Sequence, residues 1–156
     1  MMASPTALNK RGTKVCLDGY KFDSQKEADF YTRFVKNSGF HFRVHPTVEL
    51  APLKVISMPV KARQIRYTPD FVIFDAKGAV IHVYDVKNSF GMYGIDSGPK
   101  EKFAEFLHKF GIPVEAVVVR KHDFKSIAQS VTKKRKDNDP LICTNLNYSW
   151  LDATAY

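Results

Sequence analysis

The sequence predicts a mixed α/β domain in which helices flank a central mixed sheet. Three observations support this fold class. Apolar residues recur at helical spacing in residues 24–36 and 99–110, they alternate with a period of two from residue 40 onward, and an apolar run covers Val114–Val119. The 156 residues are enough for one domain with a hydrophobic core.

The N-terminal part of the chain is expected to form an arm, a hairpin and a helix. Residues 1–13 are polar and are predicted to be a flexible arm. Asp18-Gly19 favours a tight turn between two short strands. The helical spacing predicts a helix over residues 24–36, and residues 37–39, Asn-Ser-Gly, are a typical helix end.

Three strands are predicted in the middle of the chain. The first covers residues 40–50, in which Pro46 indicates an edge or a bulge. Residues 51–61 contain two prolines and are expected to form a loop or an irregular strand. Residues 65–74 and 79–87 are two β-rich runs, joined by a short turn that contains glycine.

A second helix and a buried strand are expected next. Residues 88–98 are rich in glycine and are predicted to be mobile. Pro99 suits the first turn of a helix that runs to Phe110, and Gly111 ends it. The apolar run Val114–Val119 predicts a strand buried on both faces.

The end of the chain is expected to add one more helix. Asp123 is predicted to cap a helix from Phe124 to about Lys134. One domain would then cover residues 14–136, with residues 137–156 as a C-terminal extension that packs on it or trails from it.

The net charge of the chain indicates what kind of molecule it binds. The chain has 24 Lys and Arg against 16 Asp and Glu, a net charge of +8. Such a surplus favours binding to nucleic acid, because phosphate contacts release counterions; alternatively, it serves solubility alone. No pattern for a small-molecule organic cofactor is found.

The sequence also predicts the compartment. It has no apolar run near the roughly 20 residues that span a membrane, and its N-terminus lacks a secretory pattern, so a cytoplasmic protein without a membrane partner is expected. Cys16 and Cys143 lack zinc-site spacing and are expected to be reduced thiols.

Asp70, Asp85 and Lys87 are the candidate catalytic set. Residues two apart on a strand share a face, so Asp85 and Lys87 project together, with Ile81 and Val83 further back on that face. Asp70 begins the preceding strand and is expected at the same end, since the connecting turn lies at the far end of both strands.

This set suits the hydrolysis of phosphodiester bonds. Carboxylates such as Asp70 and Asp85 bind Mg²⁺, for which Mn²⁺ substitutes, and the metal activates water and neutralises charge. Lys87 would orient or deprotonate that water, or stabilise developing negative charge. Each motif alone also occurs by chance, and Pro-Asp is a common turn dipeptide.

Pro69-Asp70 followed by Asp85-Val86-Lys87 resembles the PD-(D/E)XK nuclease superfamily. The resemblance extends over about two-thirds of the chain and implies a restriction-endonuclease-like αβββαβ core. Residues 22–28, 67–71 and 84–87 are similar, more narrowly, to small phage-encoded endonucleases of the T7 endonuclease I and TnsA-like branch. One departure is Asp85, where many relatives have Glu.

The resemblance implies that Glu27 is a further acidic residue of the active site and a metal ligand. A physical alternative exists, because Ser24-x-x-Glu27 is also a capping box in which Glu27 would bond back to the Ser24 backbone. Asp23 would have to cap the helix instead to leave Glu27 free.

Several polar residues are candidates for contacts to DNA. The resemblance suggests phosphate contacts at the start of the second helix, and the ends of the two β-rich runs supply further polar side chains. These candidates are Lys100, Lys102, Arg63, Gln64, Arg66 and Asn88, each of which could equally be a solvated surface residue. The basic run Lys133–Lys136 would grip DNA, end a helix or form a disordered tail.

Histidine chemistry is not expected. His41, His45, His82, His108 and His122 show no ligand spacing on one helix face, and His82 is predicted on the strand face opposite Asp85. In the glycine-rich segment, Phe90, Met92 and Tyr93 would stack on bases or pack as a lid.

The sequence therefore predicts a Mg²⁺-dependent endodeoxyribonuclease. The resemblance implies a phage-type enzyme in the host cytoplasm that cuts branched or Holliday-junction DNA as a homodimer. The alternatives are a non-catalytic DNA-binding protein with this fold, a nuclease subunit of a recombination or transposition complex, and a nuclease directed at RNA.

Overall fold

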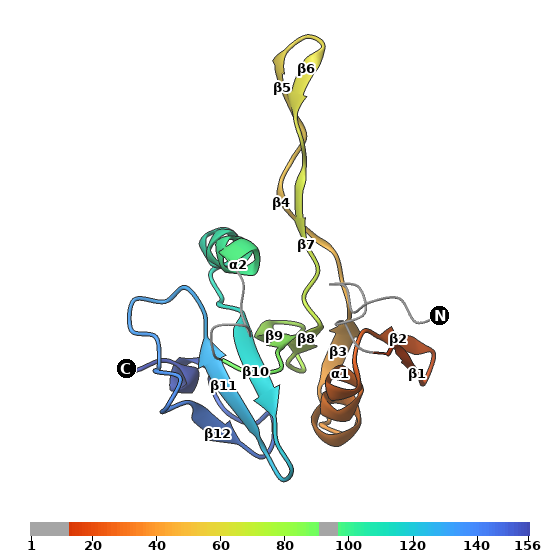
Figure 1. Ribbon diagram of the computed structural model, residues 1–156, viewed down its shortest axis with the longest axis vertical. Helices are drawn as coiled ribbons and strands as arrows, with labels where there is room; N and C mark the ends of the chain where they lie inside the picture. Colours follow the sequence, from red (N-terminus) through yellow and green to blue (C-terminus); the bar gives the residue numbers. More distant parts are fainter. Residues whose placement is uncertain (1–12, 91–96) are drawn as a thin grey trace, which may run out of the picture.

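A mixed six-stranded sheet forms the centre of the protein (Figure 1). The structure, a computed structural model, describes residues 13–90 and 97–156. The strands of this sheet are β3 (His41–Val44), β8 (Phe71–Phe74), β9 (Val80–Val86), β10 (Glu115–Val119), β11 (Phe124–Ala128) and β12 (Leu141–Cys143). Their order is β12-β11-β10-β9-β8-β3; β9 and β10 are parallel and the other neighbours are antiparallel. The predicted mixed α/β class is confirmed.

One helical segment packs on each side of the sheet. The first is α1 (Gln25–Phe30), which continues as the π-helical turn η2 (Tyr31–Val35), and the second is α2 (Ser97–Phe110). Both helices were predicted. Within the described part of the chain, no helix combines the length and apolar character needed to cross a membrane.

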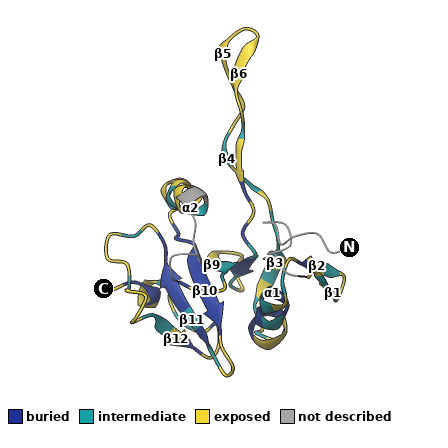
Figure 2. Cartoon of the chain, viewed as in Figure 1, coloured by how far each residue is buried: buried dark blue, intermediate teal, exposed yellow. Residues whose placement is uncertain are grey.

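Two hydrophobic clusters anchor these helices. On the α1 side, Phe30 is fully buried and its ring lies 5.0 Å from that of Phe124, edge to face. On the α2 side, Phe103 and Phe106 pack with the sheet residue Val83. Phe90 is buried in this second cluster, so it packs on the core, whereas Met92 and Tyr93 lie outside the described residues. Figure 2 shows the buried residues concentrated in the sheet.

The N-terminal hairpin has the expected turn. Strands β1 (Val15–Leu17) and β2 (Tyr20–Phe22) pair antiparallel. Asp18 and Gly19 connect them with φ values of 52° and 82°, the left-handed conformation that a tight hairpin turn requires. The hairpin places Asp23 and Ser24 at the start of α1.

The region from residue 48 to residue 67 differs from the prediction. It forms a two-stranded ribbon, the arm, that stands out from the body (Figure 1). Its strands are β4 (Val48–Ala51), β5 (Lys54–Ser57), β6 (Val60–Ala62) and β7 (Ile65–Tyr67); β4 pairs with β7, and β5 with β6. Of the two expectations for residues 51–61, the loop is wrong and the irregular strand is confirmed, since β5 pairs with β6 with a register shift between Val55 and Ser57. Pro52 lies between strands and Pro59 lies in the turn, where neither interrupts the pairing.

The arm also divides two predicted strands. Residues 45–47 separate β3 from β4, and residues 68–70 separate β7 from β8. Pro46 and Pro69 lie at these two breaks, where the chain leaves the sheet and returns to it. Both breaks lie side by side, since the His45 N–H donates to the Asp70 carbonyl at 3.0 Å.

The predicted last helix is also wrong. Residues 124–128 form β11, which pairs with β10 from Phe124↔Val119 to Ala128↔Glu115. Phe124, Ile127 and Ala128 have helix-like spacing, but they are buried in a strand that covers the edge of β10. Lys133–Lys136 therefore do not end a helix; Lys134 bridges to Thr154 instead.

Residues 137–156 pack on the sheet. Strand β12 pairs with β11, Leu146 is buried in the α1-side cluster, and the short helix η3 (Trp150–Ala153) follows. Ser149 and Asp152 form a capping box around the start of η3.

A bulge changes one expected side-chain direction. Ile73 pairs with His82 but Phe74 pairs with Val80, so Ile81 is an extra residue in β9. Ile81 packs with the α1-side cluster, whereas Val83 belongs to the α2-side cluster. The expectation that Ile81 shares the face of Val83 and Asp85 is therefore wrong.

Candidate functional site

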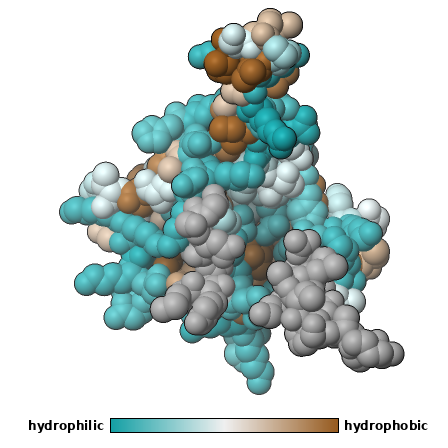
Figure 3. Space-filling view, turned by 45° about the horizontal axis from the view of Figure 1, so that its top comes forward, coloured by the Kyte–Doolittle hydropathy of each residue, from teal (hydrophilic) through white to brown (hydrophobic). Residues whose placement is uncertain are grey.

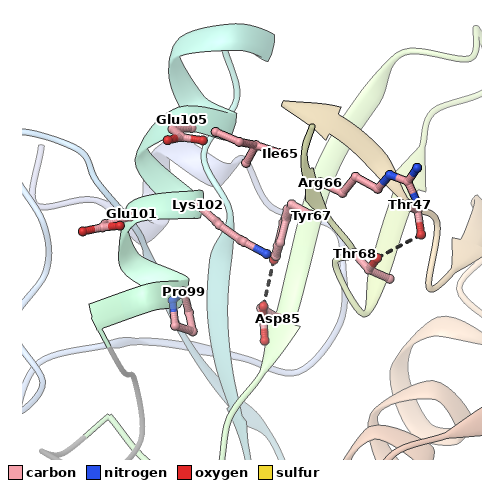
Figure 4. Close-up of a pocket in the computed structure, with 10 residues that line it drawn as sticks. All are labelled: Thr47, Ile65, Arg66, Tyr67, Thr68, Asp85, Pro99, Glu101, Lys102 and Glu105. Atoms are coloured by element: carbon pink, nitrogen blue, oxygen red, sulfur yellow. Dashed lines mark hydrogen bonds between the residues drawn. The ribbon is translucent and has the colours of Figure 1, made fainter. Parts of the chain in front are cut away.

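A cleft of about 840 Å³ lies between the base of the arm and α2. Strand β7 forms one wall with Arg66 and Tyr67, and α2 forms the other with Lys102 (Figure 4). Asp85 from β9 lines the same cleft. The cleft is open to solvent, and its lining carries both basic side chains, Arg66 and Lys102, and acidic ones, Asp85, Glu101 and Glu105.

Asp85 has two polar partners. Its Oδ1 lies 3.1 Å from Nζ of Lys87, two residues further along the chain. Its Oδ2 accepts a hydrogen bond of 2.8 Å from the Tyr67 hydroxyl, across the cleft wall (Figure 4). Tyr67 is itself held between Phe103 and Phe106, at ring distances of 5.8 Å from each. The Asp85 carboxylate is thus fixed from both sides.

Asp70 is held by three backbone contacts. Its N–H donates to the Tyr84 carbonyl, and its carbonyl accepts from the His45 N–H, both at 3.0 Å. Its Oδ2 accepts from the Val86 N–H at 2.7 Å. The last bond places the Asp70 carboxylate against the strand that carries Asp85 and Lys87.

Glu27 reaches this end of the sheet from the first turn of α1. The Ser24 hydroxyl accepts from the Glu27 N–H at 3.2 Å, so Ser24 caps the helix. The Glu27 carboxylate is buried and directs Oε1 to His45 Nε2 at 2.8 Å, with a longer contact of 3.5 Å to the Asp23 N–H. Only the Ser24 half of the capping box is formed, so the Glu27 carboxylate is free to face the site. The expectation that Asp23 would have to replace Ser24 as the cap is therefore wrong.

His45 is a member of this cluster that the sequence analysis missed. Its Nε2 lies 2.8 Å from Glu27 Oε1 and 3.6 Å from Asp70 Oδ1. Bonding to Asp70 and to Glu27 raises the pKa of His45 from 6.5 to about 10, so the ring is a cation at neutral pH. No spacing rule identifies it, because Glu27, His45 and Asp70 belong to three separate elements.

The carboxylates of the cluster are electrostatically crowded. Burial, and then the charge of Glu27, raise the pKa of Asp70, against the opposing effect of His45. Burial, and then the charge of Asp70, raise the pKa of Asp85, against the opposing effects of Lys87 and Tyr67. Such crowding is relieved by a cation, and oxygen donors of this kind suit Mg²⁺.

A second combination of possible ligands overlaps the first. One ligand atom each from Asp23, Glu27 and His45 lie within 4.8 Å of one another. Asp23 is exposed and paired with Lys14 at 3.0 Å, and His45 must lose its proton to bind a metal. The alternative set, Asp70 and Asp85 with Glu27, offers carboxylate oxygens alone, and its members are close enough for the charge of Glu27 to raise the pKa of Asp70 and the charge of Asp70 to raise the pKa of Asp85.

Two of the six predicted DNA-contact residues line the cleft, and the other four lie outside its lining. Lys102 and Arg66 line it, and Figure 4 shows Lys102 pointing toward Tyr67. Gln64 binds Glu49 and accepts from Arg66 Nε at 2.8 Å, within the arm. Arg63 is exposed on the arm, Lys100 is exposed on α2, and Asn88 is exposed after β9; these three are not among the cleft residues.

Fold and site together define a mixed α/β protein with an acidic cluster and a lysine beside an open cleft. The chain belongs to the family described as "Protein of unknown function (DUF1064)", whose model matches residues 9–110. This span contains Glu27, Asp70, Asp85 and Lys87 as well as the arm. No curated protein and no solved structure matches the chain.

Proposed function

We propose that this protein is a metal-dependent DNA endonuclease that hydrolyses phosphodiester bonds at the cleft. The observation that carries the proposal is the convergence of four side chains from three separate segments of the chain. Glu27 comes from α1, Asp70 precedes β8, and Asp85 and Lys87 come from the end of β9. Three carboxylates and a lysine at one solvent-open end of a sheet are a costly arrangement unless a ligand uses them.

The order of elements supports the same proposal. Leaving the arm aside, the chain runs α1, β3, β8, β9, α2 and β10. This is the αβββαβ order of the restriction-endonuclease-like core. Asp70 directly precedes the second strand of that order, β8, whereas Asp85 lies near the end of the third, β9, and Lys87 follows it.

Each residue has a specific role in the proposal. Asp70 and Asp85 would hold Mg²⁺, with Mn²⁺ as a substitute, and Glu27 would complete the acidic set. The metal would lower the pKa of a bound water and neutralise charge on the scissile phosphate. Lys87 orients or deprotonates the attacking water or stabilises the developing charge, and Tyr67 holds Asp85 in place.

The substrate and assembly are further parts of the proposal. The net charge of +8 favours a nucleic acid, and Lys102 and Arg66 at the cleft suit phosphate contacts. By its resemblance to small phage-type nucleases, the protein would cut branched DNA as a homodimer. A role as one subunit of a recombination complex involves the same chemistry.

The test is cleavage of end-labelled DNA. The purified chain is incubated with a four-way junction, a linear duplex of matching sequence and a single-stranded RNA, with Mg²⁺, with Mn²⁺ and with EDTA. We expect cleavage of DNA only with metal, and loss of about 10² to 10³ in rate for Asp70→Asn and for Lys87→Ala.

Lys77→Ala is the matched control, because Lys77 is an exposed lysine in the turn at the far end of β8 and β9. Its cleavage rate should equal that of the wild type. DNA binding with no cleavage under any condition would reject the enzyme and favour a non-catalytic DNA-binding protein. Cleavage of RNA alone would assign the same chemistry to another substrate.

A further inference from the structure

The arm carries a cluster of apolar side chains that the body does not cover. Leu53, Val55, Ile56, Met58 and Val60 are each between 54% and 74% exposed. Figure 3 shows hydrophobic atoms gathered at the end of the arm. Single exposed apolar residues are ordinary, but a contiguous patch at the end of a projecting ribbon indicates a binding surface.

Basic residues flank this tip. The arm contains Lys54, Lys61, Arg63 and Arg66, and its acidic residue Glu49 is bonded to Gln64. Lys54 pairs with Ala62, and Val55 pairs with Lys61, so alternation places Lys54 and Lys61 on opposite faces of the ribbon. Positive charge on both faces is complementary to a groove with phosphates on either side.

The arm is continuous with the candidate active site. Strand β7 ends at Tyr67, whose hydroxyl binds Asp85, and its residues Ile65 and Arg66 line the cleft. A ribbon ten residues long, from Val48 to Ser57, extends up to about 33 Å. This length is close to one turn of duplex DNA, about 34 Å. The arm is therefore long enough to span about one turn of a duplex held in the cleft.

We propose that the arm is a DNA-binding element whose apolar tip inserts between base steps at a branch or distortion in the DNA. The proposal rests on the proposed function only in taking DNA as the ligand of the cleft. Apolar side chains such as Ile and Met act as wedges between base steps in several DNA-bending proteins. Unstacking a regular step costs a few kcal/mol, and less where pairing is already disrupted. The tip therefore favours branched over linear DNA.

The test compares DNA binding with and without the apolar tip. The variant carries Ile56→Ser, Met58→Ser and Val60→Ser, and all three positions are exposed, so the fold is retained. The control carries Ile142→Ser and Leu151→Ser, two apolar residues exposed on the body. Fluorescence anisotropy in EDTA, which prevents cleavage, measures Kd for a four-way junction and for a duplex of matching sequence.

We expect the tip variant to bind the junction about tenfold more weakly, equivalent to about 1.4 kcal/mol, with the duplex affinity and the control unchanged. A 2-aminopurine at the branch should brighten with the wild type and not with the tip variant. Equal loss on junction and duplex, or no loss on either, would overturn the role of the tip.

Sedimentation of the protein without DNA tests the remaining alternative, in which the tip binds a second copy of the chain. If the tip variant dissociates a wild-type dimer and keeps its junction affinity, the tip binds a second copy and the DNA proposal fails. Failure of the proposed nuclease function would give a result distinct from failure of the arm proposal. Junction binding that depends on the tip, with no metal-dependent cleavage, would support the arm and reject the nuclease.

Discussion

Nε2 of His45 lies 2.8 Å from Oε1 of Glu27, and this contact links the first helix to the end of the central sheet. The same nitrogen is 3.6 Å from Oδ1 of Asp70. The imidazolium thus provides positive charge among the carboxylates that we propose as metal ligands. A metal bound there would compete with the proton on His45 for those carboxylates.

The first prediction concerns stability against pH in EDTA. The pKa of His45 is raised from 6.5 to about 10 by its bonds to Asp70 and Glu27. A raised pKa means that the folded state binds the proton more tightly, so the stabilisation is complete below pH 6.5 and is lost as the pH rises to about 10. Relative to His45→Gln, the wild type should lose about 1.5–3 kcal/mol of unfolding free energy over this range.

Urea denaturation at a series of pH values measures this difference. His122→Gln is the control, because His122 is exposed near the turn after β10. Its unfolding free energy should follow that of the wild type throughout. Parallel pH profiles for the wild type and His45→Gln would contradict the prediction.

The second prediction concerns the acidic cluster. Because burial and the charge of Glu27 raise the pKa of Asp70, its ionised form is disfavoured in the folded protein. Asp70→Asn keeps an oxygen that accepts from the Val86 N–H and removes the charge. In EDTA at pH 8 it should stabilise the protein by roughly 0.5–2 kcal/mol, as is common where a site trades stability for function.

The same variant should lose the stabilisation that Mg²⁺ or Mn²⁺ gives the wild type. Thermal unfolding with and without each metal measures both effects. The control Asp29→Asn, a half-buried carboxylate on α1 that accepts from Gln25, should retain the metal-dependent rise in Tm. An equal rise in Asp70→Asn would exclude Asp70 as a ligand.

The third prediction assigns Tyr67 a positioning role. Tyr67→Phe keeps the packing against Phe103 and Phe106 but removes the 2.8 Å hydrogen bond to Asp85. We expect a loss of about 10- to 100-fold in metal affinity or cleavage rate. The metal concentration that gives half-maximal cleavage should rise, whereas Tyr20→Phe, in the N-terminal hairpin, should leave it unchanged. A lower Tm without any change in metal dependence would point to a purely structural role.

Strand alternation and the hairpin register were enough to place part of the site from the sequence. Asp85, in β9, and Lys87, directly after it, are two residues apart, and the antiparallel pairing of β8 with β9 places Asp70 beside Val86. Local rules of this kind depend on neighbours in one hairpin. These local rules did not identify His45, because its position depends on where the chain leaves the sheet to form the arm.

The errors in the fold have a similar origin. Residues 124–128 have apolar spacing that also suits a helix, and only the unpaired edge of β10 determines that they form a strand. In the arm, Pro52 and Pro59 left a loop and an irregular strand equally open, because their places between strands and in a turn are visible only once the register is known. The strand at residues 124–128 and the paired arm both depend on pairing between separate segments, which a local sequence pattern does not reveal.

The last prediction concerns a buried charge within β10. Glu115, inside an otherwise apolar strand, is fully buried, as is its partner His82. Glu115 Oε2 lies 2.5 Å from His82 Nδ1, and its Oε1 accepts from Ser126 and Tyr148. His82 Nε2 must donate to the Leu146 carbonyl at 3.0 Å, since a carbonyl only accepts. Every polar atom of the pair is therefore satisfied.

Glu115→Ala would leave His82 buried without its partner and should cost about 3–5 kcal/mol of unfolding free energy. His82→Leu should be similarly costly, since it leaves the Glu115 carboxyl with only two hydroxyl donors. The double variant should lose less than the sum of the two, because neither residue is then left unpaired. Urea denaturation of all four proteins measures the coupling, with Glu105→Ala on the exposed face of α2 as the control. Additive losses would show that the two residues stabilise the core independently.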